Sequence, residues 1–130
     1  MKVLQPPGWP RPKGYANGVS ARGRMIFTAG VVGWDASEHF AATDLAGQFE
    51  QVLRNIAAIL AEDGAAPEHV VRMTCYVTSR DDYVASVREI GAAWRAVMGR
   101  NYPAMAVVEV SALVEAEAKV EIEATAVVPE

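Results

Sequence analysis

The sequence predicts an α/β or α+β fold with one mixed β-sheet and two long helices, in the order β-β-α-β-α-β-β. Two segments, 43–63 and 79–98, repeat apolar residues every three or four positions, as amphipathic helices do. Short apolar or alternating segments lie before, between and after them, which is typical of strands. Helices and strands interleaved in this way pack as a helical layer on a sheet.

Composition indicates a folded globular chain and argues against several functions. The 130 residues are 52% apolar and carry a net charge of −4, so we expect one domain over 1–130 and no nucleic-acid partner. The one cysteine, Cys75, allows neither an internal disulfide nor a four-cysteine metal site, and it suits a reducing cytosol. The start of the chain lacks the apolar core of a signal peptide, and no apolar run approaches the ~20 residues of a membrane span. We therefore expect a cytoplasmic chain without a metal or a membrane partner.

Residues 1–17 are expected to form an extended arm. They hold four of the seven prolines, a density that excludes a helix or a central strand. Residues 2–4 fit a short strand. Trp9 and Tyr15 should pack against the rest of the chain, because aromatic side chains favour burial.

The next two strands are expected at 18–22 and 25–32, joined by a hairpin turn at Arg22-Gly23-Arg24. The second of them opens with a largely apolar run that suits a sheet interior. Gly30 and Gly33 mark a place where the backbone can come close to another group.

The first helix is expected over 43–63, with Thr43 as N-cap, Asp44 at the positive end of the helix dipole and Gly64 just past the end. Its apolar stripe consists of Leu45, Phe49, Val52, Leu53, Ile56, Ile59 and Leu60.

Residues 70–78 alternate as a strand, with Cys75 on the apolar face and Arg72 and Tyr76 on the other. Ser79 then caps a single second helix that ends at Gly99. The apolar stripe of this helix consists of Tyr83, Val84, Val87, Ile90, Gly91, Trp94, Val97 and Met98.

The last two strands are expected at 104–110 and 119–127, the second with Glu121 and Glu123 on one face and apolar residues on the other. Two helices can cover only one face of the sheet. The other face carries Tyr76 and, depending on the register, either Met105 with Val107 or Ala106 with Val108. Such a face is too apolar to remain exposed to solvent, so we expect a closed symmetric oligomer. The alternative is an amphipathic sheet with one solvated face.

Several segments together resemble the RidA/YjgF family, from about residue 13 to the C-terminus. They follow the family in order and spacing, and only their combination is specific. They are 13–19 (KGYANGV), 25–30 (MIFTAG), 51–56 (QVLRNI), 70–77 (VVRMTCYV), 102–104 (YPA), 108–110 (VEV) and 120–124 (VEIEA).

This resemblance implies a chorismate-mutase-like fold and a homotrimer with its sites between subunits. It also implies hydrolysis of reactive enamines and imines derived from amino acids, with release of ammonia and without a cofactor. In the best-known branch, an arginine after the Pro-Ala pair holds the substrate carboxylate, a glutamate in the last strand activates water, and a tyrosine lines the pocket. Tyr15 matches that tyrosine, and Glu121 matches that glutamate, so we expect Glu121 to be catalytic rather than an ordinary strand residue.

Four polar pocket positions of the family are changed in this chain. The arginine is replaced by Met105, the serine before Gly30 by Ala29, a helical asparagine by Arg88 and the pocket cysteine by Val107. Methionine cannot form the charged, two-pronged contact of an arginine, whose loss costs about 2–4 kcal/mol of binding. Either Arg88 or Arg72 supplies a displaced cation, or the substrate is larger and less polar and contacts Met105, Ala29, Val107 and a tryptophan, Trp34 or Trp94.

Two functions are compatible with these residues. The first is a cofactor-independent hydrolytic deaminase of an enamine or imine other than the small 2-imino acids. Some family members resemble 2-aminomuconate deaminase, so an intermediate of aromatic degradation is a candidate substrate. The second is a non-catalytic trimer that binds a small metabolite. Ribonuclease activity is least favoured, because the chain is acidic and has no catalytic pair of histidines.

Overall fold

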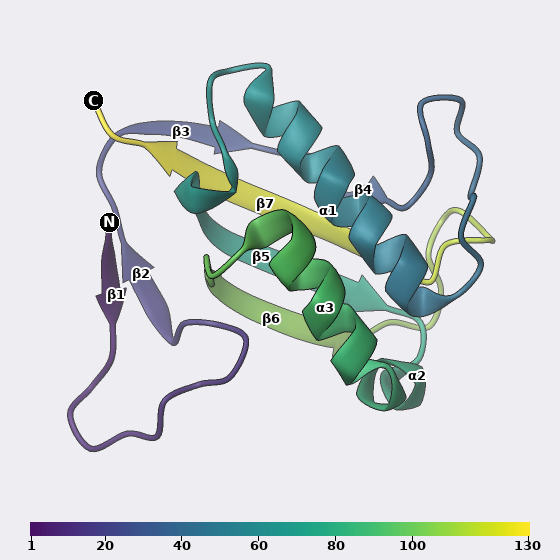
Figure 1. The fold of residues 1–130 in the computed structure, drawn as a ribbon, viewed down its shortest axis with the longest axis horizontal. Coiled ribbons are helices and arrows are strands. Elements are labelled where there is room, and N and C mark those ends of the chain that lie inside the picture. Colours follow the sequence, from purple (N-terminus) through teal and green to yellow (C-terminus); the bar gives the residue numbers. More distant parts are fainter.

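The structure is a computed structural model that describes residues 1–130. Its main sheet has five strands in the order β3-β7-β5-β6, with β4 also paired to β7. Only β5 and β6 are parallel to each other, so the predicted mixed sheet is confirmed (Figure 1). The strands are β3 (Arg24–Phe27), β4 (Val31–Val32), β5 (Val70–Val77), β6 (Ala104–Glu109) and β7 (Val120–Val128).

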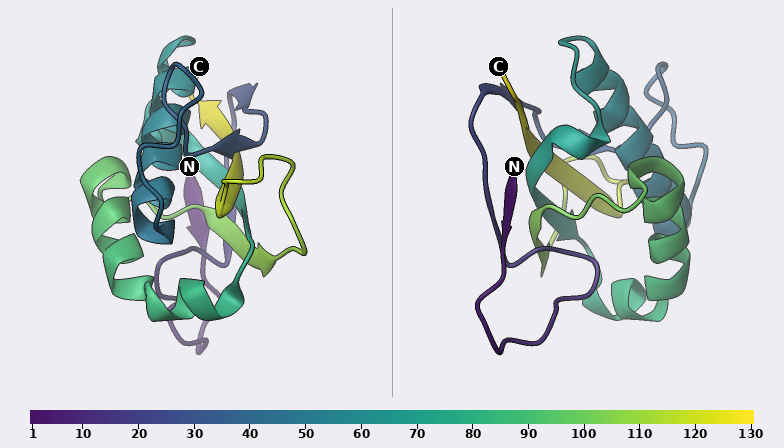
Figure 2. Two further views of the ribbon diagram at one scale, coloured as in Figure 1. Left: turned by 90° about the vertical axis from the view of Figure 1, so that its right-hand side faces the viewer. Right: turned by 60° about the vertical axis from the view of Figure 1, so that its left-hand side comes forward.

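Three α-helices lie on one face of this sheet, and the opposite face carries none (Figures 1 and 2). They are α1 (Leu45–Ala61), α2 (Arg80–Ala85) and α3 (Val87–Met98), and a 3-10 turn at Pro67–His69 leads into β5. A core of 19 buried residues fills the space between this layer and the sheet. No helix is both long and apolar enough to span a membrane.

The first helix begins one residue later than the sequence predicted. Its N-cap is Asp44, not Thr43, because the extended Asp44 places its carboxylate to accept a hydrogen bond from the Gly47 N–H at 3.2 Å. Gly64 follows the helix at a positive φ of 74°, as expected of a glycine that ends a helix. Ile59 was predicted in the core stripe, which is wrong: its side chain points away from the sheet and is 42% exposed.

The predicted second helix is two helices, separated at Ser86. Ser79 caps the first of them, as predicted, by accepting the Asp82 N–H at 3.1 Å. At Ser86 the backbone leaves the helical region, although its N–H still donates to the Asp82 carbonyl at 3.0 Å and its hydroxyl donates to the Asp82 carboxylate at 3.3 Å. Val84 and Val87 flank this break and are each 58% exposed, so placing them in the core stripe was wrong.

The N-terminal arm forms its own small sheet. Strand β1 (Lys2–Leu4) is present as predicted, and it pairs antiparallel with β2 (Gly18–Ser20). The predicted hairpin between β2 and β3 is therefore wrong, since β3 pairs with β7. Gly23 explains the path: it passes so close to the Val128 carbonyl that any side chain there would clash. Trp9 is 60% exposed, so the prediction that it packs against the chain is also wrong.

The register between β5 and β6 decides which side chains of β6 face the helices. Met105 lies opposite Met73, and Val107 lies opposite Cys75, so both face the helices. The residues that alternate with them, Ala106 and Val108, lie beside Thr74 and Tyr76 on the uncovered face. On β7 the predicted faces are confirmed: the core side is buried, whereas Glu121 and Glu123 lie on the uncovered face.

The loop before β7 is fixed by the one buried polar side chain, Gln48 on α1. Its amide donates to the carbonyls of Ala42 and Glu117 at 3.2 and 3.0 Å and accepts the Lys119 N–H at 2.8 Å. Lys119 directly precedes β7, so this amide sets where the strand that carries Glu121 begins.

Candidate functional site

A cavity of about 560 Å³ lies between the N-terminal arm, α3 and β6; we call it the arm cavity. It brings together three residues that the sequence assigned to substrate binding, Tyr15 from the arm and Met105 and Val107 from β6. The arm reaches β6 because the Ala16 N–H donates to the Pro103 carbonyl at 2.9 Å.

The wall of the arm cavity is aromatic. The rings of Trp94 and Tyr102 stack almost parallel, with centroids 6.0 Å apart and an interplanar angle of 5°. The Trp94 Nε1–H donates to the Asn101 carbonyl at 3.2 Å, which fixes the indole in place. Trp94 is buried while Tyr15 and Tyr102 remain partly exposed at the mouth. This wall is therefore a rigid, preformed surface on which a planar group can stack.

The floor of the arm cavity is apolar and stays uncharged at neutral pH. The Cys75 thiol donates to the Met105 sulfur at 3.7 Å, and burial raises the pKa of Cys75 to about 12. Burial also raises the pKa of Tyr83, with a smaller contribution from Cys75. Both groups therefore keep their protons, and Cys75 is an inert core thiol instead of a nucleophile.

Two cations border the arm cavity, Lys13 on the arm and Arg95 on α3. The chain has three ion pairs, and neither of these cations takes part in one. Arg88, the cation that the sequence suggested, is exposed on α3 and does not line the cavity. Arg72 is exposed on the uncovered face of β5. Nothing in the sequence pattern pointed to Arg95, which lies one helical turn after Gly91 on the cavity side of α3.

The remaining expected site residues form a second group on the uncovered face. The Glu121 carboxylate lies against Gly30, where any side chain would clash with it, and Ala29 directly precedes Gly30. Beside this carboxylate, the Tyr76 hydroxyl donates to Glu123 at 2.7 Å. That hydrogen bond, then burial and the charges of Glu123 and Glu121, raise the pKa of Tyr76, so it remains a neutral donor.

The sheet separates these two groups of residues within one chain. Met105 points to the helix side and Glu121 to the opposite side. The cavity residues and the Glu121 group therefore do not contact one substrate within a single copy.

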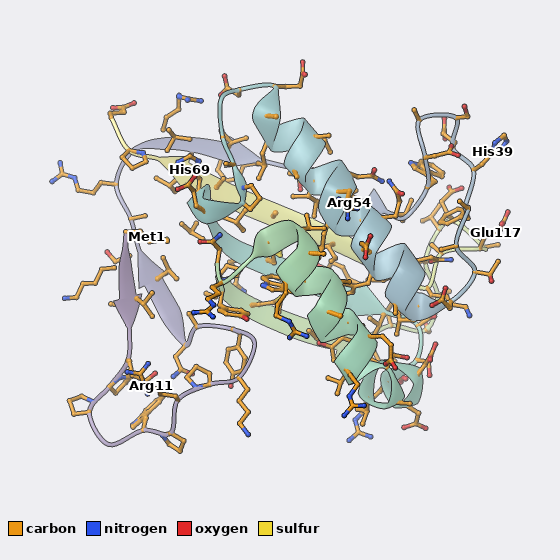
Figure 3. All side chains as sticks on the ribbon, in the orientation of Figure 1. Met1, Arg11, His39, Arg54, His69 and Glu117 are labelled. Atoms are coloured by element: carbon orange, nitrogen blue, oxygen red, sulfur yellow. The ribbon has the colours of Figure 1, made fainter.

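The two histidines contribute to neither group. Figure 3 shows His39 and His69 at opposite ends of the molecule. His69 accepts the Ala66 N–H on its Nδ1 at 2.9 Å, a local turn contact. No cluster of three or more histidine, cysteine, aspartate or glutamate side chains forms a possible metal site.

The family model described as Endoribonuclease L-PSP matches residues 10–128. The chain belongs to this family, which includes the RutC and RidA/YjgF proteins. The resemblance identified from the sequence is thus confirmed.

Individual relatives support this assignment. Protein DfrA of Myxococcus xanthus is 39% identical over 110 residues, which cover 81% of this chain and 77% of that protein. The 2-iminobutanoate/2-iminopropanoate deaminase of Escherichia coli K12 is 33% identical over 113 residues, covering 87% and 86% of the two chains. The crystal structure of the Rid family protein YyfB from Yersinia pestis matches with a TM-score of 0.82 and 33% identity over 98% of both chains. The mixed α+β fold is therefore that of the family.

Proposed function

We propose that this chain is a hydrolytic deaminase of reactive enamines or imines whose substrates are not the small 2-imino acids. The family includes a 2-iminobutanoate/2-iminopropanoate deaminase that is 33% identical to it. The observation that carries the proposal is the position of Glu121. Its carboxylate lies against Gly30, whose missing side chain leaves room for it, and the sequence resemblance matches Glu121 to the family's site glutamate.

In this reaction Glu121 acts as a general base on water. A water molecule adds to the imine carbon while the carboxylate accepts one of its protons and passes that proton to the nitrogen, which gives a neutral tetrahedral amino alcohol. The carboxylate then accepts the proton of the new hydroxyl group and passes it to the nitrogen as the carbon–nitrogen bond breaks. One imine and one water therefore yield one carbonyl product and one ammonia, with no change of oxidation state.

The substrate differs from that of the Escherichia coli relative because of Met105. A thioether at this position offers no charged donor to a substrate carboxylate. Met105 instead packs against Cys75 and extends the apolar floor of the arm cavity. A small 2-imino acid loses its principal polar contact there, whereas a larger apolar group gains buried surface.

We further propose that the active protein is a homotrimer with its sites between subunits. Met25, Phe27 and Val108 are exposed on the same sheet face as Glu121, and their burial between copies would stabilise such an assembly. The arm cavity of one copy and the Glu121 carboxylate of another would then complete one site. This explains why the two groups of residues face opposite sides in one chain.

A complementation experiment tests both statements. Glu121→Gln removes the base, and Gly91→Phe fills the arm cavity, so each variant alone should release ammonia at a background rate. Trimers assembled from an equal mixture should regain about a quarter of wild-type activity, because about one site in four combines an intact carboxylate with an intact cavity. Glu123→Gln removes a charge from the same face and should keep activity. Activity in Glu121→Gln alone would contradict the catalytic role, and no recovery in mixed trimers would contradict the shared site.

A further inference from the structure

Arg95 is an exposed cation at the border of a largely apolar cavity, where Lys13 is the other cation. Each ion pair of the chain involves other residues, so no carboxylate neutralises its guanidinium. The floor below it consists of Met105 and Val107, and the wall is the Trp94–Tyr102 stack. An unpaired guanidinium next to an aromatic and aliphatic surface is suited to a ligand with one anionic end and one apolar end.

The helix holds this guanidinium over the cavity. Arg95 lies four residues after Gly91, on the same side of α3, and its Nη1 lies 3.4 Å from where a side chain of Gly91 would begin. Both residues line the arm cavity. The guanidinium therefore lies over the preceding turn of α3, at the border of the cavity. A carboxylate that enters the cavity can therefore meet two parallel donors of one guanidinium.

The size and the shape of the cavity indicate the other end of the ligand. A volume of about 560 Å³ exceeds the need of a three- or four-carbon acid and lies in the range of sites for drug-sized ligands. Tyr83 lines the cavity from α2, and Tyr15 lines it from the arm. With Trp94 and Tyr102 already stacked, a planar ring can pack against an aromatic surface that needs no rearrangement.

We propose that the arm cavity binds 2-imino acids with an aromatic side chain, and that Arg95 pairs with their carboxylate. This statement rests on the proposed deaminase function and names its substrate class. Lys13, at the same cavity, adds positive charge near the carboxylate. The imine of such an acid takes up one water and releases one ammonia, which leaves the aromatic 2-oxo acid. That 2-oxo acid keeps both the ring and the carboxylate, so it is a stable probe of the cavity.

Binding is measured by calorimetry with two 2-oxo acids, phenylpyruvate and 2-oxobutanoate. Wild-type protein should bind phenylpyruvate at least about 10-fold more tightly, because only phenylpyruvate fills the apolar floor. Arg95→Gln should weaken phenylpyruvate binding about 10- to 100-fold, as expected for a charge-assisted hydrogen bond. Arg95→Lys keeps the charge without the planar guanidinium, so its affinity for phenylpyruvate should lie between those of wild type and Arg95→Gln. Arg88→Gln is the matched control, since Arg88 is an exposed arginine of the same helix outside the cavity.

Equal affinity for the two acids, or an equal effect of Arg95→Gln and Arg88→Gln in variants with unchanged thermal unfolding, would overturn the inference. Ammonia release from imines generated by an amino-acid oxidase tests the deaminase function separately from the inference about the substrate class. If phenylpyruvate binds through Arg95 while Glu121→Gln leaves imine hydrolysis unchanged, the substrate-class inference stands and the deaminase proposal falls. If small imines are hydrolysed through Glu121 as fast as aromatic ones and Arg95→Gln has no effect, the deaminase stands and the inference falls.

Discussion

Met105→Arg is the substitution that tests the specificity argument most directly. Met105 is half-buried at the floor of the arm cavity, so a longer side chain at this position extends into the cavity. A guanidinium there restores a two-pronged contact to a carboxylate, worth about 2–3 kcal/mol. Repulsion from Arg95, which lines the same cavity, and the lost packing against Cys75 offset about 1 kcal/mol of this gain.

The net change of about 1–2 kcal/mol predicts a 5- to 30-fold higher kcat/KM for a small 2-imino acid. The same substitution removes part of the apolar floor, so kcat/KM for an aromatic 2-imino acid should fall. The assay generates 2-iminopropanoate or its phenyl analogue with an amino-acid oxidase and follows ammonia. Met105→Leu is the control, because it keeps the volume and adds no charge.

Two results would refute this reasoning. One is a wild-type kcat/KM for 2-iminopropanoate that already equals that of Met105→Arg. The other is a gain with Met105→Leu as large as that with Met105→Arg, since leucine cannot bind a carboxylate. In either case the residue at this position does not decide between small and aromatic substrates.

Three further predictions concern the scaffold. Gln48→Ala leaves three backbone groups of the loop before β7 without their partner and should lower the free energy of unfolding in urea by about 2–4 kcal/mol; a change below about 1 kcal/mol would contradict the role of this amide. Gly30→Ala forces the Glu121 carboxylate to move, so imine hydrolysis should fall about 10-fold or more while thermal unfolding changes little; unchanged activity would mean that this contact is not needed. In the folded chain the pKa of Cys75 is raised to about 12 from 9.0, so the unfolded thiol ionises first and stability should fall as pH rises from about 9 to 12. Cys75→Ala should remove that part of the pH dependence, and an unchanged alkaline slope would show that other groups cause it.

Local periodicity predicted the parts of the fold that local contacts decide. The alternation along 119–127 fixes which side chains face the helices, and the structure confirms that Ile122 is buried and Glu121 is not. The pairing of β3 with β7 could not be read in this way, because it joins residues about 100 positions apart. A short turn around Gly23 favours a hairpin locally, but the contact of Gly23 with the Val128 carbonyl belongs to the longer-range pairing.

The break in the second helix has a similar origin. The apolar stripe continues through 79–98, so its period alone predicts one helix. The break is confined to Ser86, whose backbone leaves the helical region while its N–H still donates to the Asp82 carbonyl, and so local a change gives no signal in the sequence. The break matters for the site, because it sets where α3 starts and therefore where Gly91 and Arg95 face.

The cavity residues show why the resemblance gave the positions but not the chemistry. Tyr15 and Met105 lie together, although 90 residues separate them, and only family spacing pointed to that meeting. The register of β6 was open in the sequence, since either Met105 or Ala106 suited the core. Arg95 was hidden for a different reason: a charged residue in the last turn of a helix usually stabilises the helix dipole, which gives no reason to assign it to a site.

Met105 and Arg95 together describe a change in where the binding energy for a substrate comes from. An arginine on β6 would contribute about 2–4 kcal/mol through a carboxylate that every 2-imino acid has, small or large. In this chain the cation is on α3, and the floor of the cavity binds the side chain of the substrate instead. Burial of a phenyl-sized group contributes about 1.5–3 kcal/mol, which a methyl group cannot supply. Arg95 can pair with the carboxylate of any 2-imino acid, so the preference for a large apolar side chain comes from the apolar floor, and the same fold becomes selective without any new catalytic group.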